Sequence, residues 1–206
     1  MNKVITISRD FGSGGRELGK RLAQELGIAY YDREIVTAIA RRSELAEEYV
    51  GQILENRIMS YYPITIASSF AAMPPTDTLH YVNHRIYSAQ NETILELGQK
   101  SDCVIVGRCA DYILEEQKPF NVFVYADMDS RIARCRAKGG EDAGLGDREL
   151  QKKILSIDKS RAQYYRFYTG RVWGDRSNYD LCINTSGHSI DKLAKSLARV
   201  ISDIYG

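Results

Sequence analysis

Glycine and arginine gather in one short stretch near the start of the chain, Ser8–Lys20. The stretch contains Gly12, Gly14 and Gly15, and it stands between a β-branched run, Lys3–Ile7, and an apolar pattern with helical spacing. Glycines let the backbone turn sharply and present several N–H groups to one anion, and a helix N-terminus adds partial positive charge. A strand, a glycine-rich turn and a helix in this order predict a loop that binds phosphate.

The spacing of this stretch departs from the G-x-x-x-x-G-K-[ST] pattern. If Arg16 takes the lysine position, Gly15 fits the second glycine, but Asp10 replaces the first glycine and Glu17 replaces the magnesium-binding hydroxyl. Ser13, Glu17 and Asp127 are candidate magnesium ligands, and the sequence does not distinguish among them. A tight strand-to-helix turn without a ligand is the alternative, because glycine-rich turns are common in α/β proteins.

Composition restricts the classes of partner. The chain has 206 residues, enough for one α/β domain with a large core, and its 28 basic and 27 acidic residues give a net charge of +1. No apolar run approaches the roughly 20 residues of a membrane span, and the four cysteines show no C-x-x-C spacing. We therefore expect a cytoplasmic protein with reduced thiols that binds neither nucleic acid nor a membrane.

Apolar runs alternate with helical patterns along the chain. The predicted strands are 3–7, 28–31, 102–106, 121–126 and 179–184, and helical sequence follows each of them. Strands alternating with helices predict an α/β fold with a five-stranded parallel sheet and helices on both faces. Ligands of such folds bind where the strands end.

The polar residues that follow these strands predict the chemistry of that edge. The loop with its arginines follows the first strand, Asp32 the second, Arg108 the third, and Asp127, Asp129 and Arg131 the fourth. Asp32 is also expected to cap a helix that begins at Arg33. A guanidinium meets two phosphate oxygens at once, so a glycine cradle with converging arginines suits phosphoryl transfer.

Two further segments are expected to move or to meet a partner. The basic stretch from Arg131 to Arg148 contains four glycines and resembles a lid, although some of its cations could be no more than a solvated helix face. Farther along, Asp158 and Arg161 stand three apart on a predicted helix and can pair. The proline-bracketed segment 64–72 favours either a flap over an acceptor or a partner surface, and a homodimer through residues 43–100 is one outcome.

Several segments of the chain resemble the cytidylate kinase-like family, within the nucleoside monophosphate kinase group of P-loop proteins. The resemblance rests on Ile5–Glu17, Val104–Arg108, Asn121–Ala126, Trp173–Asp175 and Asn178–Thr185. It implies a single domain, 1–206, with the three-layer P-loop NTPase fold and a mobile lid at about 137–147. It also implies ATP and Mg²⁺ on the Gly12–Arg16 loop, and an acceptor monophosphate near Asp32 and Arg108 in the region of about 32–100.

The chain departs from that family at three places. Arg16 is the cation of the loop where these enzymes carry lysine, and Cys109 follows the Gly-Arg pair where they carry aspartate, with Asp111 further on. Their lid-side cluster of arginine and aspartate is reduced here to Asp158, Lys159, Arg161 and Arg166.

Two classes of function follow from these observations. The first is a nucleoside monophosphate kinase that moves the γ-phosphoryl group of Mg-ATP to CMP or dCMP, or a kinase of a non-nucleotide metabolite. Its ATP-binding residues would be Gly12, Ser13, Gly14, Gly15, Arg16 and Glu17, its catalytic residues Arg16, Arg131, Arg134 and Arg161, and its acceptor-binding residues Asp32, Arg108 and Asp158. The second is a nucleotide-binding regulatory or scaffold protein without turnover. A purely structural network, in which Arg9, Arg16 and Arg108 pair with Asp10, Asp32 and Glu17, is the remaining alternative.

Overall fold

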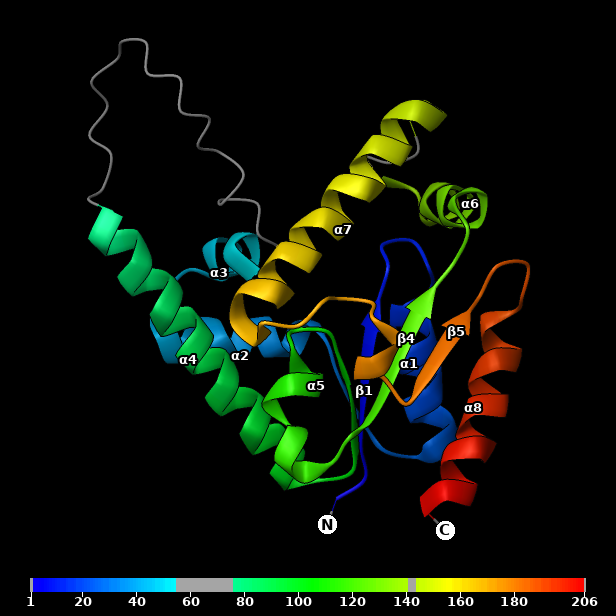
Figure 1. Cartoon of the computed structure of the whole chain (residues 1–206), viewed down its shortest axis with the longest axis horizontal. Coiled ribbons are helices and arrows are strands. Elements are labelled where there is room, and N and C mark those ends of the chain that lie inside the picture. The colour runs from blue at the N-terminus through cyan, green and yellow to red at the C-terminus, as the bar shows by residue number, and fades with distance from the viewer. Residues whose placement is uncertain (1, 55–75, 141–143, 206) are drawn as a thin grey trace.

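Strands and helices alternate along the chain in the computed structural model, which describes residues 2–54, 76–140 and 144–205 (Figure 1). The strands are β1 (Val4–Arg9), β2 (Ala29–Tyr31), β3 (Cys103–Val106), β4 (Phe120–Tyr125) and β5 (Leu181–Asn184). The helices are α1 (Gly15–Leu26), α2 (Arg33–Ser43), α3 (Glu47–Leu54), α4 (Thr76–Lys100), α5 (Ala110–Ile113), α6 (Met128–Lys138), α7 (Asp147–Thr169) and α8 (Ile190–Tyr205). Short 3₁₀ turns lie at Glu115–Gln117 and Arg176–Asn178.

The strands form one parallel sheet. Within the described residues the sheet has five strands in the order β2-β3-β1-β4-β5, so β1 lies at its centre. The register places Ile5 beside Val104 of β3, and Ile7 beside Val122 of β4. The predicted five-stranded parallel sheet is confirmed, and the loop that follows β1 starts from the middle of the sheet.

Alternation of side chains along β1 and β3 divides the core into two layers. Ile5, Ile7 and Val104 belong to a buried cluster with residues of α1 and α8, such as Leu18 and Leu197. The neighbouring residues Val4, Cys103 and Ile105 point to the other face, where they join a second buried cluster with residues of α2, α4, α5 and α7. Because each face of the sheet is covered by helices, the predicted three-layer α/β fold is confirmed.

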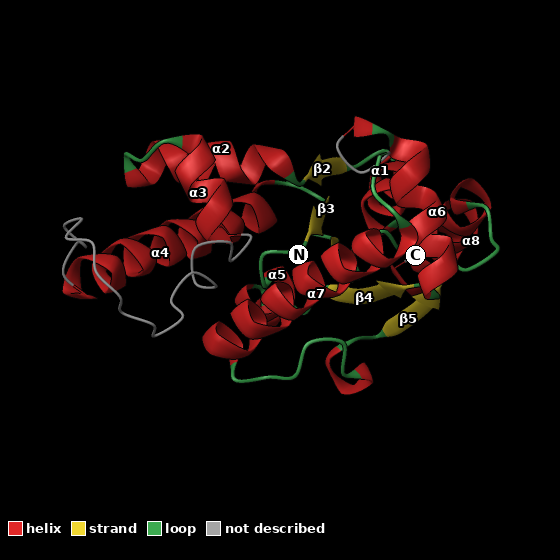
Figure 2. Cartoon of the chain, turned by 90° about the horizontal axis from the view of Figure 1, so that it is seen from above, coloured by secondary structure: helices red, strands yellow, loops and turns green. Residues whose placement is uncertain are grey.

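Helices α2, α3 and α4 lie together on one side of the sheet, as the view from above shows (Figure 2). The Arg42 Nη2 of α2 lies 2.8 Å from Glu96 Oε1 of α4, and Arg85 Nη2 of α4 donates to the Ser43 carbonyl oxygen at 2.7 Å. This helical region contains much of the predicted acceptor-binding segment 32–100. The proline-bracketed part of it, 64–72, lies outside the described residues, and the homodimer through 43–100 stays a prediction.

The predicted lid falls between two helices. Helix α6 ends at Lys138 and α7 begins at Asp147, and an Arg136–Asp147 ion pair of 2.5 Å joins these two helices. Residues 141–143 lie outside the described part of the chain, so a moving lid stays a prediction. No helix in the described ranges combines the length and the apolarity that crossing a membrane requires.

Candidate functional site

The loop between β1 and α1 turns on two glycines. Gly12 and Gly14 have φ angles of 79° and 84°, in the left-handed region that side chains disfavour. A Cβ on Gly14 would also lie 2.8 Å from Cδ1 of Ile190. No side chain caps α1 among the described residues, so the N–H groups of its first turn remain available to an anion. The geometry that the sequence predicted for a phosphate-binding loop is therefore present.

Contacts from the β5 side hold the loop in this shape. Thr185, which is fully buried, donates from Oγ1 to the Ser13 carbonyl oxygen at 2.6 Å. Arg134 in turn donates from Nη2 to the Thr185 carbonyl oxygen at 2.6 Å. The other terminal nitrogen of Arg134, Nη1, is buried and has no hydrogen-bond partner within the described ranges, and the Arg134 Nε would lie 3.6 Å from a Cβ at Gly14. Arg134 thus stands beside the loop with one donor unused, as expected for a group that meets a phosphate.

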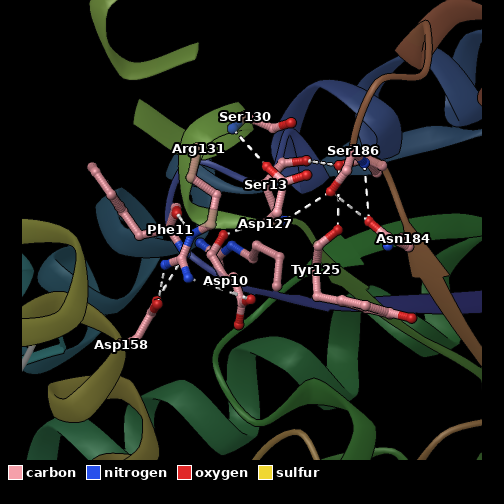
Figure 3. A network of polar contacts seen from close by, with 12 residues as sticks. Asp10, Phe11, Ser13, Tyr125, Asp127, Ser130, Arg131, Asp158, Asn184 and Ser186 are labelled. Atoms are coloured by element: carbon pink, nitrogen blue, oxygen red, sulfur yellow. Dashed lines mark hydrogen bonds and ion pairs between the residues drawn. The ribbon is translucent and has the colours of Figure 1, made fainter. Parts of the chain in front are cut away.

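Arg131 lies beside the loop, where its guanidinium joins three partners (Figure 3). Its Nε donates to the Phe11 carbonyl oxygen at 2.7 Å, Nη2 forms an ion pair with Asp158, and Nη1 lies 3.6 Å from Asp10 Oδ2. The Phe11 N–H donates to Asp158 Oδ1 at 2.8 Å. The expectation that Arg131 swings with a lid does not match this placement, because the side chain is buried in ion pairs. Its hydrogen bond to the Phe11 carbonyl oxygen supports the loop backbone.

The carboxyl groups of Asp10 and Asp158 lie near each other, because both pair with Arg131. Burial and the nearby Asp158 carboxylate raise the pKa of Asp10 to about 6, against the opposing effect of Arg131 and Arg161. The ionised form of Asp10 is therefore less stable here than in water.

Arg161 of α7 connects its helix to the end of β1. Its Nη1 donates to the Arg9 carbonyl oxygen at 3.1 Å, and its guanidinium lies 5.5 Å from the centre of the Phe11 ring. The predicted pairing with Asp158 is present, with 3.9 Å between Nη1 and Oδ1. Asp158, for which acceptor binding stays a prediction, contacts the loop backbone and Arg131.

Arg16, in the position of the loop lysine, bonds to Asp32 at the end of β2. The distance from Nε to Asp32 Oδ2 is 2.6 Å, with the Asp32 side chain buried and the Arg16 side chain 44% exposed. Asp32 occupies the N-cap position of α2 but makes no side-chain cap hydrogen bond, so the predicted capping role is wrong. The carboxylate is turned to Arg16 instead. The Arg16–Asp32 pair of the structural-network alternative is present, and Glu17 pairs with Arg21 at 2.8 Å. Whether Arg16 also binds a phosphate stays a prediction.

The backbone after β3 is left-handed over three residues, of which two are not glycine. Gly107, Arg108 and Cys109 have φ angles of 74°, 62° and 55°. Left-handed conformations of residues other than glycine cost free energy and concentrate at functional sites. Arg108 therefore follows the end of β3 in a backbone conformation that residues with a side chain disfavour.

The residues that replace the family's aspartate have internal roles. Burial raises the pKa of the Cys109 thiol, which keeps it protonated. Asp111 is buried and accepts a hydrogen bond of 2.6 Å from the Tyr165 hydroxyl, which ties α5 to α7. The acceptor side of the site thus has Arg108 but no carboxylate directly after it.

The candidate magnesium ligands make other contacts. The Ser13 hydroxyl donates to the Asp10 carbonyl oxygen at 2.9 Å, and Glu17 is paired with Arg21. Asp127 accepts the Ser130 N–H at 2.7 Å, which lowers its pKa and keeps it ionised (Figure 3). Across the described ranges no group of three or more metal-binding side chains occurs. A magnesium ion carried by nucleotide phosphates needs only one or two carboxylates, and Asp127 and Asp10 are of that type.

Sequence reasoning gave little weight to two residues that the structure brings to the loop. The sequence assigns Arg9 to a structural network and places Thr185 in the last segment of the family resemblance, and it predicts for neither a contact that holds the loop. The sequence feature that indicates a role for both residues is their place at the end of a predicted strand, where ligands of parallel sheets bind.

Comparison with known proteins places this geometry in a family. A sequence profile of the cytidylate kinase-like family matches residues 4–187. A cytidylate kinase of Ignicoccus hospitalis is 23% identical over 198 residues, covering 96% of this chain and 98% of its own.

Solved structures of similar fold agree. An uncharacterized protein from Eubacterium ventriosum superposes with a TM-score of 0.70 at 24% identity, covering 98% of this chain and 99% of its own. A shikimate kinase from Bacteroides thetaiotaomicron gives a TM-score of 0.57 at 18% identity, covering 97% and 98%. These likenesses show the fold, and the family indicates a kinase of nucleotides or other small molecules. The chain belongs to the cytidylate kinase-like family.

Proposed function

We propose that the protein transfers the γ-phosphoryl group of Mg-ATP to a nucleoside monophosphate, with CMP or dCMP as the acceptor. The observation that carries the proposal is the uncapped start of α1, formed by left-handed glycines, with the unused Nη1 donor of Arg134 beside it. Such a loop offers N–H groups and a guanidinium to the charge that is spread over a migrating phosphoryl group. The cytidylate kinase from Ignicoccus hospitalis and the family supply the choice of acceptor.

All of the predicted site residues except Glu17, which pairs with Arg21, have a role in this proposal. The backbone from Gly12 to Gly15 holds the ATP phosphates, and Arg16 and Arg134 approach them from opposite sides of the loop. Arg131 and Asp158 keep the loop in shape, because they bond to its backbone at Phe11. Arg161, Arg108 and Asp32 lie toward the acceptor. The acceptor phosphate is itself a competent nucleophile, so no general base is required.

Magnesium supplies charge neutralisation for the ATP phosphates when it is bound. In this chain Asp127 and Asp10 are the carboxylates that could accept its water ligands. Ser13 and Glu17 are held by the bonds described above.

The bond between Arg16 and Asp32 favours a second candidate function. A cation that is already paired is less available to a phosphate, which would suit a nucleotide-binding regulatory protein without turnover. A kinase of a non-nucleotide metabolite is the further alternative within the enzyme class, since the fold is shared with a shikimate kinase.

A coupled assay of ADP release tests the proposal. The purified chain is mixed with Mg-ATP and, separately, with CMP, dCMP, UMP, AMP, dTMP and shikimate. We expect acceptor-dependent release with CMP or dCMP, and an Arg16→Ala variant should lose turnover by a factor of about 100 with little change in ATP affinity, as for a group that acts in the transition state. Arg171→Ala is the matched control, because Arg171 pairs with Glu115 away from the loop.

The contrary outcomes separate the alternatives. ATP binding by folded protein without ADP release for any acceptor would support the regulatory protein. Release with shikimate alone would support a metabolite kinase.

A further inference from the structure

Arg16 of α1 and Asp32 at the end of β2 form a two-point ion pair. The Arg16 Nε lies 2.6 Å from Asp32 Oδ2, and Nη2 lies 3.4 Å from Oδ1, so one edge of the guanidinium faces both carboxylate oxygens. The Asp32 side chain is buried, whereas the Arg16 side chain is 44% exposed. Carboxylate and phosphate bind a guanidinium through the same planar edge, so a phosphate can take the place that Asp32 occupies.

The position of Asp32 in the sheet holds the Arg16 guanidinium toward β2. This strand lies at the edge of the sheet, and β3 separates it from β1, from which the loop starts. Two strand spacings amount to roughly 10 Å. The guanidinium therefore has to leave the carboxylate before it can meet a phosphate on the first N–H groups of α1.

The backbone around Arg16 is fixed, so this movement requires only rotation of the side chain. The Tyr30 hydroxyl donates to the Arg16 carbonyl oxygen at 3.3 Å, which joins the first turn of α1 to β2. A Cβ on Gly15 would lie 2.5 Å from the Arg9 Cβ, so the start of α1 packs closely on the end of β1. Exposed side chains change rotamer quickly, and nearly half of the Arg16 side chain is exposed.

Asp32 keeps other favourable charges near it when the guanidinium leaves. It occupies the N-cap position of α2 without a side-chain cap hydrogen bond, and a helix N-terminus favours a negative charge beside it. Its carboxylate also attracts Arg9, because the Asp32 charge opposes the lowering of the Arg9 pKa. The buried carboxylate thus remains partly compensated, which makes the pair with Arg16 easier to break than an isolated buried pair.

We infer that Asp32 is a positioning residue that holds Arg16 out of the ATP site, and that the guanidinium exchanges the Asp32 carboxylate for a phosphate when ATP binds. The inference rests on the proposed function, which places the ATP phosphates on the loop. Since Arg16 gives up one anion for another, its net contribution to ATP affinity is small. Removing the Asp32 carboxylate alone should therefore make ATP bind more tightly.

The sign of this effect separates the exchange from other roles of Asp32. If Asp32 oriented Arg16 toward a phosphate, or only held α1 on β2, its loss would weaken ATP binding. Loss of a negative charge near the loop could also raise the affinity without any exchange. That general effect would persist in a chain without Arg16, whereas the exchange requires Arg16.

Titration calorimetry without an acceptor measures the exchange, with Mg²⁺-bound AMP-PNP, an ATP analogue that is not hydrolysed, and inorganic triphosphate as the probes. Asp32→Asn should bind both about 3- to 10-fold more tightly than the original chain, as fits the loss of a partly exposed ion pair. The double variant Asp32→Asn/Arg16→Ala should bind them like Arg16→Ala, because Asp32 acts through Arg16. Asp32→Glu keeps the charge and should return the affinity toward the original value.

Glu115→Gln is the matched control. Glu115 accepts a two-point bond from Arg171 Nη2, at 2.7 and 2.9 Å, away from the loop, so its loss should leave the affinity for both probes unchanged. Thermal unfolding adds a readout of folding. AMP-PNP should raise the unfolding temperature of Asp32→Asn by more than that of the original chain.

Each remaining outcome supports or overturns the exchange. Weaker or unchanged binding in folded Asp32→Asn, or a gain that persists in the double variant, would overturn it. Tighter binding that requires Arg16, without ADP release for any acceptor, would uphold the exchange while the proposed kinase activity fails. Acceptor-dependent ADP release by the original chain, with unchanged nucleotide affinity in Asp32→Asn, would uphold the kinase and remove the exchange.

Discussion

Two arginines lie close to the same loop, and their surroundings are opposite. Arg131, beside the loop, is bonded to the Phe11 carbonyl oxygen and pairs with the carboxylates of Asp158 and Asp10. Arg9, at the end of β1, has three guanidinium groups around it and one carboxylate that is bonded elsewhere. The charged groups bonded to Arg131 are carboxylates, whereas most of the charged groups that affect the pKa of Arg9 are guanidinium groups, which lower it.

The difference separates a cation that is paired with carboxylates from one whose charged neighbours are mostly cations. A buried charge with its partners in place holds neighbouring segments in position, and removing it leaves those partners uncompensated. A charge among like charges adds little to the stability of the free protein and becomes favourable when an anion binds. Functional sites commonly keep such locally unfavourable arrangements.

The largest effect should come from removing Arg131, whose charge is paired with two carboxylates. Arg131→Met would leave Asp158 and Asp10 without their buried cation, and we expect a loss of about 3–5 kcal/mol in the free energy of unfolding. Urea unfolding at pH 7 measures it. Arg171→Met, which removes an exposed ion pair with Glu115, should cost about 1 kcal/mol or less. Equal effects of the two substitutions would mean that Arg131 does not hold the loop in place.

The next effect concerns the loop glycine. Gly14→Ala puts a methyl group 2.8 Å from Ile190 Cδ1 at a φ of 84°, so strain and collision add, and we expect a loss of about 2–3 kcal/mol. Gly27→Ala is the matched control, because Gly27 has a φ of 65° with nothing within 4 Å of an added Cβ. It should cost about 1–2 kcal/mol from the backbone alone.

Thermal unfolding of the two alanine variants gives the comparison. If Gly14→Ala is no less stable than Gly27→Ala, the packing of the loop against α8 contributes nothing. ATP affinity should fall in Gly14→Ala and stay unchanged in Gly27→Ala.

The smallest effect is a pH dependence that sharpens the comparison at Asp10. Its pKa is about 6 in the folded protein, against an ordinary value of 3.8. Between these values the folded state binds more protons than the unfolded state, so the Asp10 contribution to stability is highest below about pH 4 and is lost as pH rises through about 6. Unfolding measured from pH 4 to pH 7 should show this decline in the original chain and a weaker decline in Asp10→Asn. Identical pH profiles would contradict the burial of this carboxyl group.

Much of the fold was predictable because its signals are local. Unbroken apolar runs such as Val104–Val106 indicate a strand covered on both faces, and strands alternating with helices leave a parallel sheet as the simple arrangement. The sharp turn of the loop at Gly12 and Gly14 was predictable for the same reason, because glycine adopts left-handed backbone conformations readily.

The charge partners in the site were not predictable, because they join residues far apart in the sequence. Arg131 meets Asp158 and Phe11, and nothing near Arg131 in the chain indicates that it is buried rather than on a lid. Asp32 stands where a helix cap is expected, yet a guanidinium 16 residues earlier holds its carboxylate. The contact between Arg9 and Gly107 was not predictable, because only the pairing of β1 with β3 brings these two residues together.

A crystal structure of the chain with ADP and Mg²⁺ tests the central claim most directly, that the loop between β1 and α1 holds the phosphates of the nucleotide. We predict that the β-phosphate of ADP lies on the N–H groups at the start of α1 beside Arg134, and within about 3 Å of the Arg16 guanidinium. Nucleotide bound away from the loop, or nucleotide on the loop with Arg16 still bonded to Asp32, would contradict the account.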